Sequence, residues 1–514
     1  MDLAIVNGFV WRPGNPQPGT AVAVSGERIA AIGTDDEIRA LTTTATRVID
    51  AEHGTIMPAF NDAHVHFLMG SRALGELDLH GAETLDEVER RITAYAKARR
   101  EGWVVGRGWF YSAFPGAMPT VALLDRLIPD RPAFIESYDA HTGWANSKAL
   151  ALAGTSTIDV LREEAMGTVT RHIPARTRSE ELDALRAGMR LAASHGIASV
   201  QEAGHGLDQL PLWDALHAAG DLTLRVRVAF DVVPDMGLAE WKRRLDEYEE
   251  VTSARAPNGW VTTGILKAFA DGVIESRTAW VLDPYEGEVD GMGAPNFPGS
   301  SLAEDVRAAS ERGWQVQVHA IGAAAIRQAL DAFAGTAPER RHRIEHIEAP
   351  SPIDINRFGE VGVIASMQPQ HAEPNRNLFD AWAKNLGPTR AAGGWPWASL
   401  LRSSARLAFG SDWPVVPIDP FFSLHVAVNR QTRDHTPPGG WIPAERLRLE
   451  QAVEPWTSGS AYAEHAEHIK GEIRAGLLAD LAVLDRNLGA IREDEIKGTK
   501  VTATVVGGRI VYEG

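Results

Sequence analysis

The chain contains no cysteine among its 514 residues. Disulfides and thiolate ligands are therefore excluded, and any bound metal has to rest on nitrogen and oxygen atoms. The sequence also lacks an apolar run of about 18 residues, so no membrane-spanning helix is predicted. The first residues, Met1 to Ile5, have neither the basic nor the apolar region of a secretion signal. We therefore expect a cytoplasmic protein.

Positive charge is scarce as well. Lysine and arginine number 51 against 68 aspartates and glutamates, which gives a formal net charge of −17. Nucleic acids and anionic membranes attract clustered cations, so neither is expected as a partner. With 44% hydrophobic and 23% charged residues, the composition is that of an ordinary globular protein. We expect a small-molecule substrate, with a homodimer as the default assembly.

Short strands and turns are predicted at both ends of the chain. The turn Ser25–Arg28 separates two apolar segments near the start, and Gly507-Gly508 is typical of a hairpin near the end. Neither end is long enough to bury a core alone. Residues 1–57 and 466–514 are therefore expected to pair into one small β-sandwich domain.

The middle, residues 58–465, alternates strands with helices. One helix is expected to begin with Ser179 as its N-cap and to end at Gly196, directly before a strand. Such alternation predicts a parallel sheet, and eight units suit a (β/α)8 TIM-like barrel. Residues 67–178 then form a long insertion after strand one, which shapes the pocket. The strands are expected, in order, around His64, Val200, Leu224–Val228, Ile265–Phe269, Gln315–His319, Ile344–His346, Ile364–Gln368 and Leu407–Asp412.

Residues of the types that bind metals lie at the carboxyl ends of several of these predicted strands. His64 and His66 lie two apart, so a strand presents them on one face, where both can bind one ion. A single histidine is more often a hydrogen-bonded core residue than a ligand. In a barrel, however, the carboxyl ends of all strands meet at one mouth. Convergence is therefore predicted for His64, His66, Lys267, His319, His346 and Asp412.

Five segments together resemble the metal-dependent amidohydrolase superfamily, in particular its YtcJ-like branch (amidohydrolase 3 type). The resemblance spans nearly the whole chain and says little about the substrate. The segments are residues 58–67, 267–272 followed by Ser276-Arg277-Thr278-Ala279, 318–322, 343–346 and 409–414.

This resemblance implies a site for two divalent metal ions. His64 and His66, with Asp412, would hold one ion, and His319 and His346 the second. Lys267 would bridge them as an N6-carboxylated lysine, because burial frees the neutral amine that reacts with carbon dioxide. A lysine paired with Asp271 or Glu202 beside a single metal is the alternative. Zinc is the preferred assignment, and manganese, iron or cobalt would also suit these ligands.

The expected chemistry is hydrolysis of a C–N bond of the amide type, including N-substituted formamides. A metal-activated hydroxide would attack the carbonyl, with Asp412 as general acid and base. His371 is a candidate for contact with the substrate or a developing oxyanion. Glu345 is expected to face away from the site, and His205 to lie on the surface. Substrate-binding candidates are Trp109, His141, Trp144 and Arg277.

Other activities stay open. A deaminase of a cyclic amidine or aromatic amine ranks second, because no acid directly follows His319 in Ala320-Ile321-Gly322. A lactone or carbamate hydrolase would use the same centre. A non-catalytic binding protein is least favoured, because all six ligand positions are filled.

Overall fold

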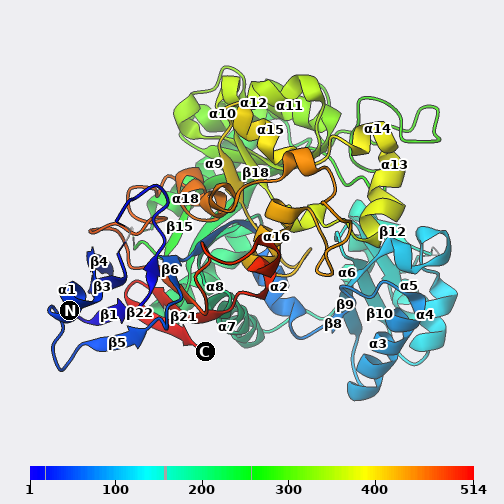
Figure 1. Cartoon of the computed structure of the whole chain (residues 1–514). Helices are drawn as coiled ribbons and strands as arrows, with labels where there is room; N and C mark the ends of the chain where they lie inside the picture. The colour runs from blue at the N-terminus through cyan, green and yellow to red at the C-terminus, as the bar shows by residue number, and fades with distance from the viewer. Residues whose placement is uncertain (18, 156–158, 256–257) are drawn as a thin grey trace.

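A parallel barrel forms the centre of the molecule (Figure 1). The computed structural model describes residues 1–17, 19–155, 159–255 and 258–514, so that 156–158 of the insertion lie outside the described residues. The barrel strands follow one another in chain order, and each pairs in parallel with the next. They are β7 (Phe60–Val65), β13 (Ile197–Glu202), β14 (Arg225–Asp231), β15 (Val261–Phe269), β16 (Gln315–Gly322), β17 (Arg343–Ala349), β18 (Ile364–Met367) and β19 (Leu407–Phe409).

Two backbone hydrogen bonds join the last strand region to the first. The amide of Asp412 donates to the His64 carbonyl at 2.8 Å, and the amide of His66 donates to the Trp413 carbonyl at 2.9 Å. These bonds bring the segment after β19 beside the end of β7. The predicted eight-stranded barrel, with all eight strands in the predicted order, is confirmed.

Helices cover the outside of the barrel because their apolar stripes pack on the strands. The helix expected at Ser179 is α7 (Arg178–Ser194), and its N-cap is Thr177 rather than Ser179. Thr177 and Glu180 form a capping box that satisfies two amide groups, and a start at Ser179 would forfeit it. Further helices of the middle of the chain are α8 (Gly206–Ala218), α9 (Leu238–Ser253), α10 (Ser301–Glu311), α11 (Ala323–Phe333), α12 (Ile355–Val361), α15 (Trp397–Arg402) and α16 (Pro420–Asn429).

Both chain ends build a pair of sheets beside the barrel, as predicted. One sheet has the order β4-β3-β1-β5 and the other β2-β6-β20-β21-β22. Their apolar side chains share one core that joins Ile5, Val22 and Ile49 to Val483 and Val505. The domain limits at 57 and 466 stay a prediction. The strands are β1 (Leu3–Val6), β2 (Phe9–Val10), β3 (Ala21–Ser25), β4 (Arg28–Gly33), β5 (Arg47–Asp50), β6 (Thr55–Pro58), β20 (Leu481–Leu484), β21 (Val501–Val506) and β22 (Arg509–Glu513).

The long insertion after strand one carries its own sheet, β12-β11-β10-β9-β8, and its own apolar core. Figure 1 shows it in cyan and light blue beside the barrel. No helix in the described ranges has the length and apolar character needed to cross a bilayer. The elements of the insertion are α2 (Phe67–Ala73), β8 (Leu77–Asp78), α3 (Leu85–Ala98), β9 (Val104–Trp109), α4 (Val121–Leu127), β10 (Ala133–Ser137), β11 (Thr142–Ala145), α5 (Ser147–Leu152), β12 (Leu161–Arg162) and α6 (Gly167–Thr170).

Candidate metal centre

A cavity of about 570 Å³ opens at the carboxyl ends of the barrel strands. Its floor carries His66 after β7, His319 from β16, His346 from β17 and Asp412 after β19. The insertion contributes Tyr138, Asp139, Ala140, His141, Glu163 and Met166 to its wall. The cavity at the mouth of the barrel is therefore lined by four of the six predicted strand-end residues and, on one side, by the insertion.

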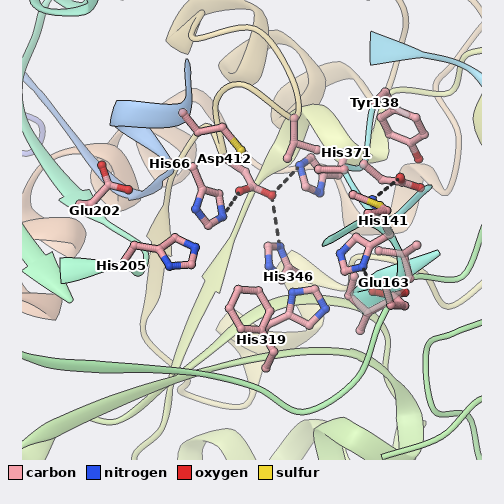
Figure 2. A pocket seen from close by; sticks show the side chains of 18 of the residues that line it. His66, Tyr138, His141, Glu163, Glu202, His205, His319, His346, His371 and Asp412 are labelled. Carbon is pink, nitrogen blue, oxygen red and sulfur yellow. Dashed lines mark hydrogen bonds and ion pairs between the residues drawn. The ribbon is translucent and has the colours of Figure 1, made fainter. Parts of the chain in front are cut away.

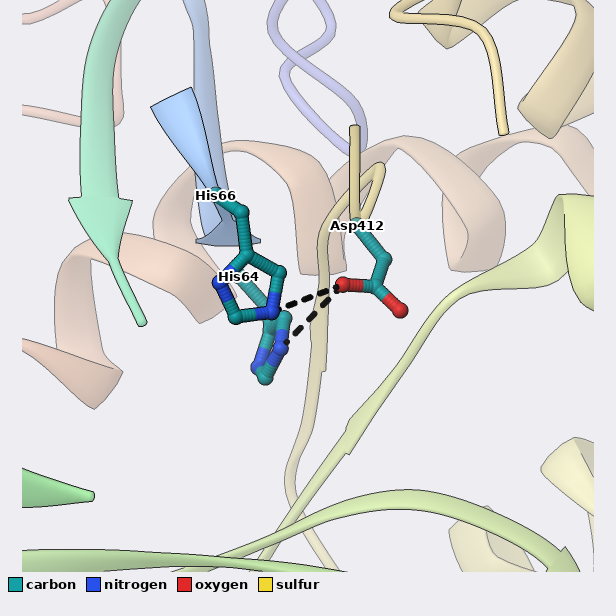
Figure 3. A group of neighbouring side chains, drawn as sticks. All are labelled: His64, His66 and Asp412. Carbon is teal, nitrogen blue, oxygen red and sulfur yellow. Dashed lines mark ion pairs between the residues drawn. The ribbon is translucent and has the colours of Figure 1, made fainter. Parts of the chain in front are cut away.

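Asp412 is the hub of this cavity (Figures 2 and 3). Its Oδ1 lies 3.4 Å from Nε2 of His64 and 3.5 Å from Nε2 of His66. Its Oδ2 lies 3.4 Å from Nε2 of His371 and 3.8 Å from Nδ1 of His346. One carboxylate thus faces four imidazoles, which come from the ends of two strands, β7 and β17, and from the turn Pro369–Ala372 after β18.

The backbone around Gly410 brings Asp412 into this position. A Cβ at Gly410 would lie 2.5 Å from the amide nitrogen of His64, so only glycine permits this approach. The buried carboxylate of Asp62 accepts hydrogen bonds from the Ser411 amide at 2.9 Å and the Ser411 hydroxyl at 2.5 Å. Asp412 itself has a left-handed backbone, with φ of 59°. Gly410 therefore lets the segment that carries Asp412 pass close to the end of β7.

Burial keeps the histidines of the centre neutral. Loss of hydration lowers the pKa of His64, His66, His319 and His346 well below the usual value, and neighbouring positive charges act in the same direction. A neutral imidazole keeps a lone pair on one nitrogen, which is the form that binds metal ions.

Hydrogen bonds fix the orientation of three rings. Nδ1 of His64 lies 2.7 Å from Oε2 of Glu345, and Nδ1 of His346 lies 2.8 Å from Oε1 of Gln368. Nε2 of His319 donates to the Gly272 carbonyl at 3.1 Å. Partners of this kind hold metal-binding imidazoles in one tautomer and leave the opposite nitrogen free.

Glu345 corrects an expectation from the sequence. It was expected to face away from the site because side chains alternate along a strand. In the structure Glu345 and His346 are both buried, and Glu345 contacts the ring of His64. His346 has φ of 74° and Ile347 has φ of 51°, and this left-handed backbone breaks the alternation of β17. Glu345 therefore supports the predicted metal ligand His64.

Lys267 lies against the same ring. Its Nζ is 3.3 Å from Nε2 of His64 and 4.5 Å from the centre of the Phe269 ring. Burial lowers the pKa of the Lys267 ammonium to about 8, so neutral amine is accessible near neutral pH. The alternative partners are engaged elsewhere: Asp271 accepts the amides of Trp280, Ile321 and Gly322, and Glu202 accepts the amide of Leu68.

The donors fit a divalent metal, although the converging groups differ from the predicted ligand sets. Among the described residues, three ligand atoms converge within 4.8 Å in two groups: His64, His66 and Asp412, and His346, His371 and Asp412. Oδ1 of Asp412 and Nε2 of His371 are buried and have no hydrogen-bond partner among the described residues, as ligands awaiting an ion would. His319 is in neither group: its Nε2 donates to the Gly272 carbonyl and its ring centre lies 4.5 Å from that of His346, so its role as a ligand stays a prediction.

His141 reaches the cavity from the insertion, as predicted. Its Nδ1 lies 2.8 Å from Oε2 of Glu163, and its ring centre lies 5.8 Å from that of His319. Burial opposes a charge on His141, but the hydrogen bond and charge of Glu163 outweigh it and raise the pKa of His141 to about 9. The insertion thus places His141, whose raised pKa favours the imidazolium, beside the candidate metal ligands.

Three other substrate-binding candidates lie outside the cavity. Trp109 and Trp144 are fully buried in the core of the insertion, and their indole nitrogens donate to the carbonyls of Ile135 and Thr120. Arg277 binds Glu288 and donates to Asn385 on a partly exposed loop. These three expectations were wrong: the two tryptophans pack in the core of the insertion, and Arg277 forms an ion pair with the nearby Glu288.

Glutamates also line the cavity, and only Glu202 among them was considered from the sequence, as a partner of Lys267. Glu202 ends β13, Glu348 lies in β17 and Glu275 follows β15. Burial raises the pKa of Glu202 and Glu348 to about 8. His205, expected on the surface, is exposed at the cavity rim beside Glu202 (Figure 2). These acids could have been predicted from their position at or after the carboxyl ends of barrel strands, because the same criterion identified the histidines.

The profile of the amidohydrolase family matches residues 47–512. The chain therefore belongs to the amidohydrolase family, in agreement with the resemblance drawn from its motifs. Protein LONG AFTER FAR-RED 3 of Arabidopsis thaliana is 28% identical over 547 residues, which cover 99% of this chain and 91% of that protein. The putative amidohydrolase YtcJ of Bacillus subtilis is 27% identical and covers 91% of each chain.

Two further similarities bear on chemistry and fold. The N-substituted formamide deformylase of Arthrobacter pascens is 26% identical, over 100% of this chain and 98% of that enzyme. The crystal structure of an uncharacterized metal-dependent hydrolase from Pyrococcus furiosus superposes with a TM-score of 0.72 at 27% identity. It covers 94% of this chain and 99% of that one. Relatives of this chain therefore include metal-dependent hydrolases of the same architecture.

Proposed function

We propose that this protein is a metal-dependent hydrolase that cleaves an amide-type C–N bond of a small molecule, with N-substituted formamides among its substrates. The observation that carries the proposal is Asp412, whose two oxygens face His64 and His66 on one side and His346 and His371 on the other. The full-length similarity to a formamide deformylase supports this bond type.

The ligand assignment is also proposed. His64, His66 and Asp412 hold one divalent ion, and His346, His371 and Asp412 offer a second position. Lys267, carboxylated on Nζ, is proposed to join them. Ions bound there supply Lewis acidity, which polarises a carbonyl oxygen and makes water nucleophilic near neutral pH. Zinc suits the imidazole and carboxylate donors.

Asp412 is suited to move the proton. Burial raises the pKa of Asp412 to about 6, while His371 and Lys267 favour its ionised form. A group that titrates near the working pH can both accept and return a proton. Water adds to the carbonyl carbon and gives its proton to Asp412. The C–N bond then breaks, Asp412 protonates the leaving nitrogen, and the products are a carboxylic acid and an amine.

His141 is proposed to receive the substrate carbonyl, and His371 shares this role when its Nε2 does not hold the second ion. His371 faces the cavity with an Nε2 that has no hydrogen-bond partner in the described part of the chain, and His141 carries a positive charge held by Glu163. Donors placed where negative charge develops lower the barrier of acyl transfer. Both rings lie on the same side of Asp412 (Figure 2).

The test combines metal analysis with turnover of a panel of amides, formamides, lactones, carbamates and aromatic amines. We expect purified protein to hold divalent metal, a chelator to abolish amide hydrolysis, and zinc or manganese to restore it. Asp412→Asn should lower kcat by about 10²–10⁴-fold. Asp290→Asn, on the exposed surface, is the matched control. Ammonia release from an amine, lactone turnover alone, or full activity without metal would each overturn the proposal.

A further inference from the structure

A second cavity of about 220 Å³ lies directly beside the metal centre. It shares Tyr138, Glu275 and His371 with the first cavity, so these residues form the partition between the two. We call the second cavity the side chamber. His371 spans the partition, with Nε2 at 3.4 Å from Asp412 and Nδ1 at 3.4 Å from Oε1 of Glu348. A substrate held at Asp412 therefore reaches the side chamber across the width of one imidazole.

Carboxyl groups gather at this partition. Tyr138 donates its hydroxyl hydrogen bond to Glu275, and the Trp382 indole donates to Oε2 of Glu348 at 2.7 Å. Asp139 is only 7% exposed, and its Oδ2 has no hydrogen-bond partner within the described ranges. Several acids in one buried corner repel one another unless a positive charge joins them.

The side chamber has aromatic walls and a second unpartnered acceptor. Phe110, Tyr138, Trp382 and Trp395 line it, and the two tryptophans stack with ring centres 4.4 Å apart. Asn377 lines the same chamber at 4% exposure, and its Oδ1 accepts no hydrogen bond from any described residue. Aromatic faces and free acceptors together attract ammonium groups.

The lysines and arginines along the two cavities do not neutralise these acids. Those lining either cavity in the described part of the chain are Arg72 and Arg433. Arg72 forms a bidentate pair with Glu181, with both contacts at 2.8 Å. Arg433 binds Asp419 at 2.8 Å. The nearest imidazolium, His141, is held by Glu163. Within this corner, burial and mutual repulsion raise the pKa of Glu275 and Glu348 and favour their neutral forms, whereas a cationic ligand would let them ionise.

A metal ion does not account for the corner. In the described residues, the only groups that bring three metal-binding atoms within 4.8 Å are those built on Asp412. Asp139, Glu275 and Glu348 are thus too spread out to cage a small ion. A larger organic cation, with several N–H groups or methyl groups, matches carboxylates that are separated and backed by aromatic rings.

We infer that Asp139, Glu275 and Glu348, with the rings of Tyr138 and Trp382, form a subsite for a protonated amine carried by the substrate. The inference rests on the proposed function and narrows its substrate class to amides that bear a second, cationic amine. The amide lies at Asp412 and the ammonium lies at the partition, among Asp139, Glu275 and Glu348.

Calorimetry on the metal-loaded protein tests the subsite without turnover. Hexylammonium and hexan-1-ol are the probes, and Glu275→Gln/Glu348→Gln is the variant, which keeps the size of both side chains. We expect hexylammonium to bind at least about tenfold more tightly than hexan-1-ol, and the double variant to lose that preference. Glu286→Gln, exposed and outside both cavities, should keep it. Equal affinity for the two probes, or a preference unchanged in the double variant, overturns the subsite.

Turnover supplies the second readout. Mono-N-formylcadaverine and N-hexylformamide differ in an ammonium that replaces a methyl group. The ratio of their kcat/KM values should exceed about ten in the native protein and fall toward one in the double variant. A ratio near one in the native protein contradicts the inference. If neither formamide is hydrolysed while hexylammonium binding still depends on the two glutamates, the proposed function fails and the subsite stands.

Discussion

Removal of Glu345 gives the sharpest test of how the metal centre is supported. Glu345 is fully buried, and its two oxygens serve two different partners. Oε2 lies 2.7 Å from Nδ1 of His64, and Oε1 accepts from Nε of Arg343 at 2.9 Å. Arg343 is itself fully buried and donates to the Ala63 carbonyl at 2.9 Å. The carboxylate therefore orients a proposed ligand and neutralises a buried guanidinium.

The magnitudes follow from these contacts. Glu345→Ala leaves the Arg343 charge buried without its acid, which should cost about 3–5 kcal/mol of stability. Glu345→Gln keeps the shape but offers one acceptor oxygen, so it can serve His64 or Arg343 but not both. Its expected cost is about 1–3 kcal/mol. Loss of the carboxylate behind a metal-binding imidazole should also weaken metal binding about 10–100-fold.

Two measurements separate the two roles. Urea unfolding of the metal-free proteins gives the stability order native, Glu345→Gln, Glu345→Ala, with the exposed substitution Glu495→Gln as a control. Competition with a chromophoric chelator gives the metal affinity of the Gln variant. Metal affinity equal to that of the native protein would refute the link from Glu345 through His64 to the centre. A stability loss below about 0.5 kcal/mol for Glu345→Ala would refute the buried charge pair.

Three further outcomes follow. Metal-loaded protein in carbon-13 bicarbonate should show a carbamate resonance that Lys267→Met lacks, and a spectrum without it in the native protein would leave Lys267 a plain amine. Gly410→Ala should cost about 1–3 kcal/mol in urea unfolding and weaken metal binding, because its Cβ would lie 2.5 Å from the His64 amide; unchanged values would contradict that contact. Burial lowers the pKa of His342 to about 4 from an unfolded value near 6.5, so its stabilisation is complete above pH 6.5 and is lost as the pH falls toward 4. Between pH 7 and 5 this loss is about 2 kcal/mol, and His342→Gln should remove that part of the pH dependence of urea unfolding.

The cavity walls come from two sources that play different parts. The barrel supplies the strand-end imidazoles and Asp412, which are the candidate metal ligands. The insertion supplies Tyr138, Asp139 and His141, which are a phenol, a carboxyl group and an imidazole. In barrel enzymes the strand ends usually carry the catalytic groups, and the loops and insertions attached to the barrel usually determine which substrate binds.

The sequence by itself determined the barrel, its strand order and the residues at its mouth. Hydrophobic periodicity is local, and parallel strands bring all their carboxyl ends to one edge, so strand-end residues such as His64, His346 and Asp412 could be located without coordinates. The pairing of both chain ends into sheets followed from the same patterns, because neither end could bury a core alone.

Only the tertiary structure decided which neighbours meet. The left-handed backbone at His346 accompanies the burial of both Glu345 and His346, and Glu345 contacts the ring of His64. The group of converging ligand atoms that contains His346 and Asp412 includes His371, whereas Nε2 of His319 donates to the Gly272 carbonyl. Trp144, predicted to contact the substrate, is buried in the core of the insertion. Such outcomes depend on loop backbone and on contacts between residues far apart in the chain, and local periodicity carries no information about either.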